Sequence, residues 1–257
     1  MIIRKSAQEI ERMARSGRVV AATHALLADH IRPGVTTGEL DKLAEDFIRS
    51  QGGVPTFLGY RGFPASLCLS PNDMVVHGIP GPYALAEGDI LSVDVGVTLD
   101  GFVADAAYTH AVGDVPADAT RLLEVGQEAL AAGVAQARPG NRLSDISHAV
   151  QSATEAAGFS VIRSLVGHGV GRSMHEDPQI PNFGEPGRGP LLQPGMTLAI
   201  EPMINAGGPD VYVHDDQWSI STADGSLSCH FEHTVAVTEA GPRILTQMNE
   251  VPVRQAV

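Results

Sequence analysis

The stretch "LLQPGMTLAIEP", residues 191–202, contains an apolar, strand-like run that is entered through a Pro-Gly pair and ends at Glu201. A carboxylate on a mostly apolar strand is costly unless something pairs with it. An earlier stretch, "LAEGDILSVDVG" (85–96), has the same shape, because its glycine is also followed six residues later by an acid, Asp94. The two acids are 107 positions apart, which suggests that one stretch is a copy of the other.

The same spacing recurs upstream of both stretches. Arg-Pro-Gly triplets at 32–34 and 138–140 lie 106 positions apart, and each precedes a helical pattern, over 37–50 and 144–157. Three features that keep nearly one offset indicate a duplication. The sequence therefore predicts an α/β fold in which each half has a long helix, a turn, a second helix and several strands, the halves being related by a pseudo-twofold.

The long helix that opens each half has its own start signal. Ser6 and Glu9 form a capping-box pattern ahead of Ile10 and Met13, which are expected to point inward. The corresponding helix of the second half is expected to begin near Asp118. Both halves thus begin with a helix that has an apolar face.

Length and composition favour one large domain. The 257 residues are at the upper end for a single domain, which we expect to span 1–257 with halves of roughly 1–113 and 114–247. The net charge of −13 argues against tight nucleic-acid binding. No run of eighteen apolar residues and no signal core occur, so we expect a cytoplasmic protein without a membrane span. Two cysteines form neither a disulfide framework nor a zinc motif.

The acids of the first half lie on a predicted hairpin. The segment "ILSVDVGVTLDGFVADAAYTHAV" predicts two strands around an Asp-Gly turn. If Leu99 pairs with Phe102, Asp94 lies opposite Ala107, and Asp105 is two residues away on the same face. Diagonal neighbours of this kind approach within about 7 to 8 Å, close enough for both side chains to reach one ion.

The second half supplies a matching pair of acids. Glu201 corresponds to Asp94, and Glu232, within the predicted strand "SCHFEHTVAVT", corresponds to Asp105. The pseudo-twofold would bring both pairs to the centre, where four carboxylates repel one another unless they are neutralised. Two divalent cations would neutralise them and could hold a water molecule between them. The sequence therefore predicts a dinuclear metal site.

Histidines are expected to complete this site. His168 lies between glycines in an apparent Gly-rich turn and is the best imidazole ligand; one nitrogen among oxygens suits Mn, Fe(II), Co or Zn better than Ca. His77 follows a strand and His175 lies in a loop, and both suit proton transfer or oxyanion stabilisation. The histidines interpreted as ordinary polar residues are His24, His30, His110, His148 and His214.

Taken in order, the motifs resemble those of type I methionine aminopeptidases. The segments are "NDMVVHGIP", "VDVGV" with "GFVADAAYTHAVG", "GHGVGRSMHEDPQIPNF", "LAIEPM" and "DGSLSCHFEHTVAVT", and they cover essentially the whole chain. The resemblance, which is to the compact bacterial form, implies the pita-bread fold around a central dimetal site. Its implied ligands are the five residues selected above, namely Asp94, Asp105, His168, Glu201 and Glu232.

The implied reaction is hydrolysis of the first peptide bond of a chain that begins with methionine followed by a small residue. By the same resemblance Glu201 accepts a proton from water, His175 stabilises the tetrahedral intermediate, and His77 contacts the scissile amide nitrogen. Aromatic rings and a thiol suit a thioether side chain. The methionine pocket is expected to consist of Phe57, Tyr60, Phe63, Cys68 and Trp218.

The expected cofactors are two divalent ions, with Co, Mn, Fe(II) and Zn as candidates. Nascent polypeptide N-termini are the expected partners, with transient ribosome association, and the chain is expected to be a monomer. Three positions depart from the family pattern and are expected to lie at the edge of the substrate pocket: Pro71, Gln217 in place of the usual glycine, and His230 in place of the usual glutamine.

Two alternative functions remain open from the sequence. The first is an Xaa-Pro aminopeptidase or prolidase, which uses the same five ligand types but generally carries an additional N-terminal domain; here the first repeat begins almost at Met1. The second is a non-catalytic binding protein on this scaffold. Loss of one or more ligands would mark such a protein, whereas all five are present.

Overall fold

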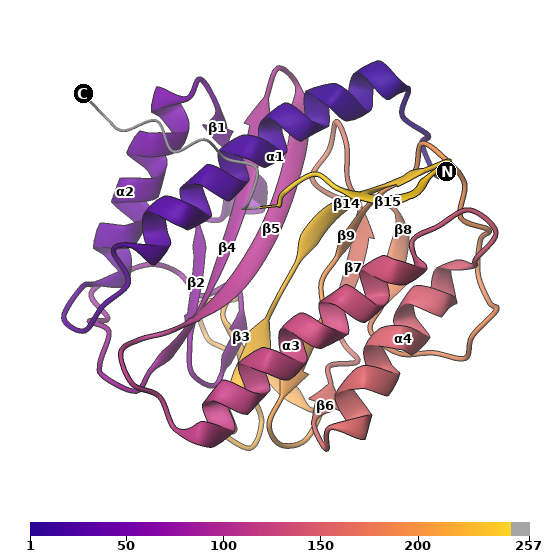
Figure 1. The fold of residues 1–257 in the computed structure, drawn as a ribbon. Helices are drawn as coiled ribbons and strands as arrows, with labels where there is room; N and C mark the ends of the chain where they lie inside the picture. The colour runs from indigo at the N-terminus through magenta and orange to yellow at the C-terminus, as the bar shows by residue number, and fades with distance from the viewer. Residues whose placement is uncertain (248–257) are drawn as a thin grey trace.

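The computed structural model describes residues 1–247 and has two halves with the same order of elements (Figure 1). Each half begins with a long helix and a shorter one, and strands follow. The helices are α1 (Ala7–Ala28) and α2 (Thr37–Ser50) in the first half and α3 (Ala117–Gln136) and α4 (Leu143–Ala156) in the second. The predicted α/β duplication is confirmed, and both shorter helices lie within one residue of their expected bounds. The predicted single domain over 1–257 extends past the described residues.

Local capping explains where α1 and α2 begin. The Ser6 hydroxyl accepts a hydrogen bond from the Glu9 amide, and the Glu9 carboxylate accepts one from the Ser6 amide, so the predicted capping box is present at α1. Thr36 and Glu39 form the same pair of bonds at α2. These reciprocal bonds satisfy amide groups that a helix N-terminus otherwise leaves without partners.

The strands of the two halves differ in length and continuity. The strands of the first half are β1 (Val54–Pro55), β2 (Cys68–Pro71), β3 (Met74–Val76), β4 (Ile90–Leu99) and β5 (Phe102–Ala111). A short 3₁₀ turn, η1 (Tyr60–Gly62), lies between β1 and β2. The strands of the second half are β6 (Ser160–Val161), β7 (Val166–Gly169), β8 (Glu176–Pro181), β9 (Thr197–Ile200), β10 (Met203–Asn205), β11 (Val211–Val213), β12 (Ile220–Thr222), β13 (Ser228–His230), β14 (His233–Thr238) and β15 (Gly241–Ile244).

Two larger sheets form the centre of the molecule. In the first half β4 lies between β1 and β2 and also pairs with β5, and in the second half the order is β15-β14-β9-β7-β8. Two small sheets, β13-β10-β6 and β11-β12-β3, complete the strands. In Figure 1, α1 crosses in front of β4 and β5, while α3 and α4 lie side by side over the second half.

The central hairpin has the predicted register. Leu99 pairs with Phe102 and Asp94 pairs with Ala107, while Asp105 lies opposite Gly96. Asp94 and Asp105 are therefore diagonal neighbours on one face of the β4–β5 ladder. The two-residue turn fixes this register, because a slip by one residue would move both acids to the other face.

The strand predicted to carry Glu232 is broken, and this expectation was wrong. Its first part, β13, pairs with β10, and its second part, β14, pairs with β9 in another sheet. Between them the amide of Glu232 donates to the carbonyl of Ala107 on β5, 2.8 Å away. The strand that leads to Glu201, β9, also ends at Ile200, and the next strand, β10, begins at Met203. Both glutamates therefore lie at breaks between strands.

Each half has its own apolar core. In the first half the core lies between the helices and β4, with Val20, Leu40 and Val95 fully or almost fully buried. In the second half it lies between α3, α4 and the larger sheet, where Leu122 and Leu198 are fully buried. Within residues 1–247, no helix is long and apolar enough to cross a bilayer.

Candidate metal centre and its cavity

One cavity of about 270 Å³ brings together all of the side chains that the sequence selected. Five are the expected ligands, two are the histidines expected to act beside them, and the remainder are the expected pocket residues. The selected residues that line the cavity are Phe57, Tyr60, Phe63, Cys68, His77, Asp94, Asp105, His168, His175, Glu201, Trp218 and Glu232. Residues from both halves therefore meet in one site.

The first-half acids lie on rigid backbone. Asp94 and Asp105 are 8 % and 2 % exposed, on the inward face of β4 and β5. The Asp105 amide donates to the Thr234 hydroxyl (2.9 Å), which donates in turn to the Asp105 carbonyl (2.8 Å). This pair of bonds joins β5 to β14 and fixes one half against the other at the site.

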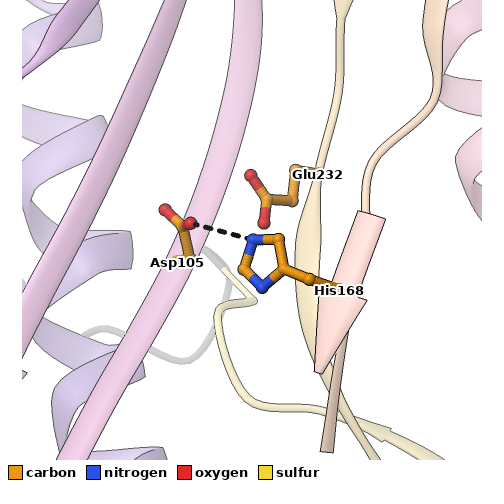
Figure 2. Close-up of side chains that lie close together, drawn as sticks. All are labelled: Asp105, His168 and Glu232. Carbon is orange, nitrogen blue, oxygen red and sulfur yellow. Dashed lines mark ion pairs between the residues drawn. The ribbon is translucent and has the colours of Figure 1, made fainter. Parts of the chain in front are cut away.

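His168 reaches the same place from β7. Its Nδ1 lies 2.9 Å from the carbonyl oxygen of Gly169, which can only accept, so Nδ1 carries the proton and Nε2 has a free lone pair. Nε2 lies 3.5 Å from Glu201 Oε1 and 4.0 Å from Asp105 Oδ2. One ligand atom each from Asp105, His168 and Glu232 lie within 4.8 Å of one another, and Figure 2 shows the three side chains converging.

The expectation that His168 lies in a turn was wrong, because the glycines around it serve strand packing. A Cβ at Gly167 would lie 2.5 Å from the carbonyl oxygen of Ala199, and one at Gly169 would lie 2.1 Å from that of Asp177. The two glycines let β7 pack closely between β8 and β9. His168 is thereby held on a strand at a fixed depth.

The electrostatics of the acid cluster favour bound cations. Burial raises the pKa of Glu201 to about 8 and that of Asp94 to about 6. Burial, with the neighbouring carboxylates, raises the pKa of Asp105 and of Glu232 well above the usual range. Within the described residues, one oxygen of Asp94, of Asp105 and of Glu232 is buried without a hydrogen-bond partner. Divalent ions would both neutralise the charge and bind these oxygens, so the residues fit a metal centre.

Two further histidines flank the acids. His77 follows β3 with φ 59°, a left-handed conformation that non-glycine residues adopt at a cost and often at functional sites. Burial lowers the pKa of His77 to about 4, so its ring is neutral at pH 7. His175 lies just before β8; its Nδ1 is 2.8 Å from the Tyr60 hydroxyl, and its ring centre is 4.3 Å from that of His168.

The rest of the cavity is apolar and aromatic. Phe57, Phe63 and Cys68 are buried, and Trp218 packs edge-to-face on Phe63 with ring centres 5.1 Å apart. A Cβ at Gly96 would lie 2.9 Å from the Phe57 ring, so the glycine opposite Asp105 makes room for that wall.

Comparison with known proteins identifies the family. Residues 11–239 match metallopeptidase family M24. The chain belongs to this family. It is 52 % identical over 248 residues to methionine aminopeptidase 1 of Bacillus subtilis, covering 96 % of this chain and all of that protein. The crystal structure of the methionine aminopeptidase of Rickettsia prowazekii superposes with a TM-score of 0.95 at 42 % identity, covering 96 % of this chain and all of that one.

The fold extends to proteins of lower sequence identity. The prolidase of Pyrococcus furiosus superposes with a TM-score of 0.77 at 21 % identity, covering 95 % of this chain but 65 % of that one. At this identity the likeness concerns the fold alone. The predicted pita-bread fold and the prediction of a metal-dependent peptidase are confirmed, and a non-catalytic protein on this scaffold is not supported.

Sequence reasoning missed several residues that line the cavity of this M24 metallopeptidase, among them Arg61, Leu165, Met174 and Met203. Arg61 and Met174 adjoin selected residues, and Met203 follows Glu201 by two positions, so proximity along the chain was the signal for these three. His230 was expected at the edge of the substrate pocket. Its Nε2 instead lies 3.6 Å from Glu201 Oε2, among the acids. The signal for this placement was its position two residues before Glu232.

Gln217, another departure from the family pattern, occupies a glycine-like conformation. Its φ is 65°, in the left-handed region where glycine is favoured. This explains why a glycine suits the position. The next residue, Trp218, nevertheless reaches the cavity, so the substitution leaves the aromatic wall in place.

Proposed function

We propose that this M24 metallopeptidase removes the N-terminal methionine from polypeptides whose second residue is small, with two divalent cations as cofactors. One observation carries the proposal: five oxygen and nitrogen donors converge in a cavity whose remaining wall is aromatic and sulfur-containing. The relatives that match nearly the whole chain, and are matched over nearly their whole length, are named methionine aminopeptidases. Both lines of support lead to one substrate class.

The proposed metal ligands are Asp94, Asp105, His168, Glu201 and Glu232. Four carboxylates balance the charge of two divalent ions, and one imidazole among oxygens suits Mn, Fe(II), Co or Zn. When bound, such ions activate a water molecule and polarise the scissile carbonyl. The unpartnered oxygens of three of these acids support this assignment.

The methionine side chain would enter the pocket formed by Phe57, Phe63, Cys68 and Trp218, beside Tyr60. A thioether packs favourably against ring edges, and the edge-to-face pair of Phe63 and Trp218 presents such a surface. Burial raises the pKa of the Cys68 thiol well above its usual range, so this sulfur packs as a neutral group and does not act as a nucleophile.

Three side chains would handle protons and developing charge. Glu201 would take a proton from the attacking water at a carboxylate oxygen and pass it to the leaving amine. The ring of His77 would contact the scissile amide nitrogen. His175, held by the Tyr60 hydroxyl 2.8 Å away, would donate to the carbonyl oxygen as negative charge develops on it.

A second candidate, an Xaa-Pro peptidase, rests on the shared fold of the prolidases. Protein reconstituted with each of Mn, Fe(II), Co and Zn should be assayed on Met-Ala-Ser, Leu-Ala-Ser and Ala-Pro peptides. We expect rapid cleavage of Met-Ala-Ser alone. Preferential cleavage of Ala-Pro would replace the proposal with the prolidase function.

The size of the second residue can be tested with the same protein. We expect Met-Ala-Ser to be cleaved faster than Met-Leu-Ser, because the second residue must pass His77 and His175 at the cavity. Nascent polypeptide N-termini are the proposed natural substrates. The predicted ribosome association, monomeric state and cytoplasmic location stay predictions from the sequence.

A further inference from the structure

His230 presents an unpartnered nitrogen to the acid cluster. It ends β13, is 2 % exposed and lines the cavity. Within residues 1–247 its Nε2 is buried and has no hydrogen-bond partner. A buried polar atom without a partner is unfavourable. Because this nitrogen faces a cavity, a group bound in the cavity could serve as its partner.

The surroundings of His230 match those of His168. The Nε2 atom of His168 lies 3.5 Å from Glu201 Oε1 and 4.0 Å from Asp105 Oδ2. The Nε2 atom of His230 lies 3.6 Å from Glu201 Oε2 and 4.0 Å from Glu232 Oε2. The carboxylate of Glu201 is therefore flanked by one imidazole at each oxygen.

These distances suit atoms that share a cation. Nitrogen and oxygen ligands bound at about 2.0 to 2.2 Å from one ion lie roughly 3 to 4 Å apart. The separation of 3.6 Å between His230 Nε2 and Glu201 Oε2 is longer than a good N–H···O hydrogen bond. A neutral imidazole also adds a donor without adding charge to the four carboxylates.

We propose that His230 Nε2 is a second imidazole ligand of the metal centre, opposite His168 across Glu201. This assignment rests on the proposed dinuclear site and adds one ligand to it. It predicts a site with two nitrogen and four carboxylate ligands, which suits Zn, Co or Fe(II) better than a site with one nitrogen.

The test counts imidazoles at bound zinc by X-ray absorption. Wild-type protein loaded with two zinc ions should show an average of about one imidazole per ion, and His230→Gln should show about half of that. His175→Gln is the matched control, because it removes an imidazole from the same cavity without removing a proposed ligand. It should keep the wild-type count.

Calorimetric titration with zinc gives an independent readout. We expect His230→Gln to lose affinity at one of the two ions by about tenfold or more. Thermal melting of the ion-free proteins checks that the variant is folded, and His230→Asn provides a second variant with the same expected losses.

The contrary outcomes are distinct. An unchanged imidazole count together with unchanged zinc affinity in His230→Gln would overturn the ligand assignment and leave the two-ion site intact. Wild-type protein that binds zinc with half an imidazole per ion would do the same. Failure of the wild-type protein to bind zinc or any of the other candidate ions would refute the proposed metal centre itself.

Discussion

The two halves bring equivalent acids to the centre on differently built backbone. In the first half Asp94 and Asp105 lie within β4 and β5, which are ten-residue strands without interruption. In the second half Glu201 and Glu232 lie at breaks, between β9 and β10 and between β13 and β14. Short acids therefore come from continuous strands, and longer acids come from strand ends.

The difference has a structural cause and a consequence. The amide of Glu232 bonds to Ala107 in the other half, so the backbone leaves its own ladder to join the halves. The longer glutamate side chains then span the remaining distance to the cluster. Glu201, with a side chain that is 13 % exposed, has more freedom than Asp105 at 3 %. This freer position suits the proposed role of Glu201 as the carboxylate that takes up and releases a proton.

The largest expected effect comes from the rigid side of the site. Asp105→Asn should abolish metal binding and lower turnover by more than about 1000-fold, because it removes one negative charge and one ligand oxygen from the site that would hold the ions. Metal content and turnover should be measured together. Asp100→Asn, in the exposed hairpin turn, is the control and should bind metal normally. Near-normal metal content and turnover in Asp105→Asn would refute the four-acid site.

The next prediction separates His168 from His175. His168→Ala should lose metal affinity and recover in part with excess metal. His175→Ala should keep its metal and remain about 10² to 10³-fold slow, because the loss of one donor to a developing oxyanion costs about 2.7 to 4 kcal/mol. Metal titration of activity in both variants, with metal content determined separately, tests the two roles. If excess metal fully restored the activity of His175→Ala but not that of His168→Ala, the two assigned roles would be reversed.

A third prediction concerns the pH dependence of the metal-free protein. Burial raises the pKa of Glu201 from 4.5 to about 8, so its contribution to stability is fully present below pH 4.5 and is lost as pH rises through about 8. We expect deprotonation of Glu201 to lower the free energy of unfolding by on the order of a few kcal/mol across that window. In thermal melts of the chelated proteins, the melting temperature of the wild type should therefore fall more between pH 4.5 and 8 than that of Glu201→Gln. Identical pH profiles for the two proteins would contradict the prediction.

His24, which packs against β5, should show the opposite pH dependence in the same thermal melts. His24 is fully buried, and its Nε2 lies 2.9 Å from the carbonyl oxygen of Ala106. Burial lowers the pKa of His24 from 6.5 to about 3, so its contribution to stability is present above pH 6.5 and is lost as pH falls toward 3. Acid destabilisation should therefore persist in Glu201→Gln, which separates the two effects.

Local rules explain what was predictable from the sequence. The capping residues Ser6 and Glu9 mark the start of α1 by contacts within one turn, and the Asp-Gly turn fixes the register that pairs Leu99 with Phe102. Such features depend on neighbours in the chain, so a pattern of residue types reveals them. The diagonal placement of Asp94 and Asp105 on one face followed from that register.

Long-range contacts explain what was not predictable. The break before Glu232 depends on a bond to Ala107 in the other half, which no local pattern encodes. The glycine beside His168 suggested a turn, whereas its function is to let the strand approach Asp177. His230 was expected at the edge of the substrate pocket, because its approach to Glu201 depends on the break between β13 and β14 and on contacts between distant segments.

The smallest expected effect tests the comparison between the halves most directly. Exchanging acid lengths, as Asp94→Glu and Glu201→Asp, keeps every charge but misplaces the carboxylates by about one methylene. Asp94→Glu forces extra volume beside Cys68, its partner across the β2–β4 ladder, whereas Glu201→Asp falls short of the cluster. Each should weaken metal binding by about 10 to 100-fold, the scale of misplaced coordination geometry, while the ion-free fold survives. The two changes displace different carboxylates, one too long and one too short, so neither corrects the other. The double variant should therefore not restore affinity. Calorimetric titration of the three variants with zinc gives the measurement. Wild-type affinity in Glu201→Asp would mean that the break between β9 and β10 does not require the longer glutamate side chain at position 201.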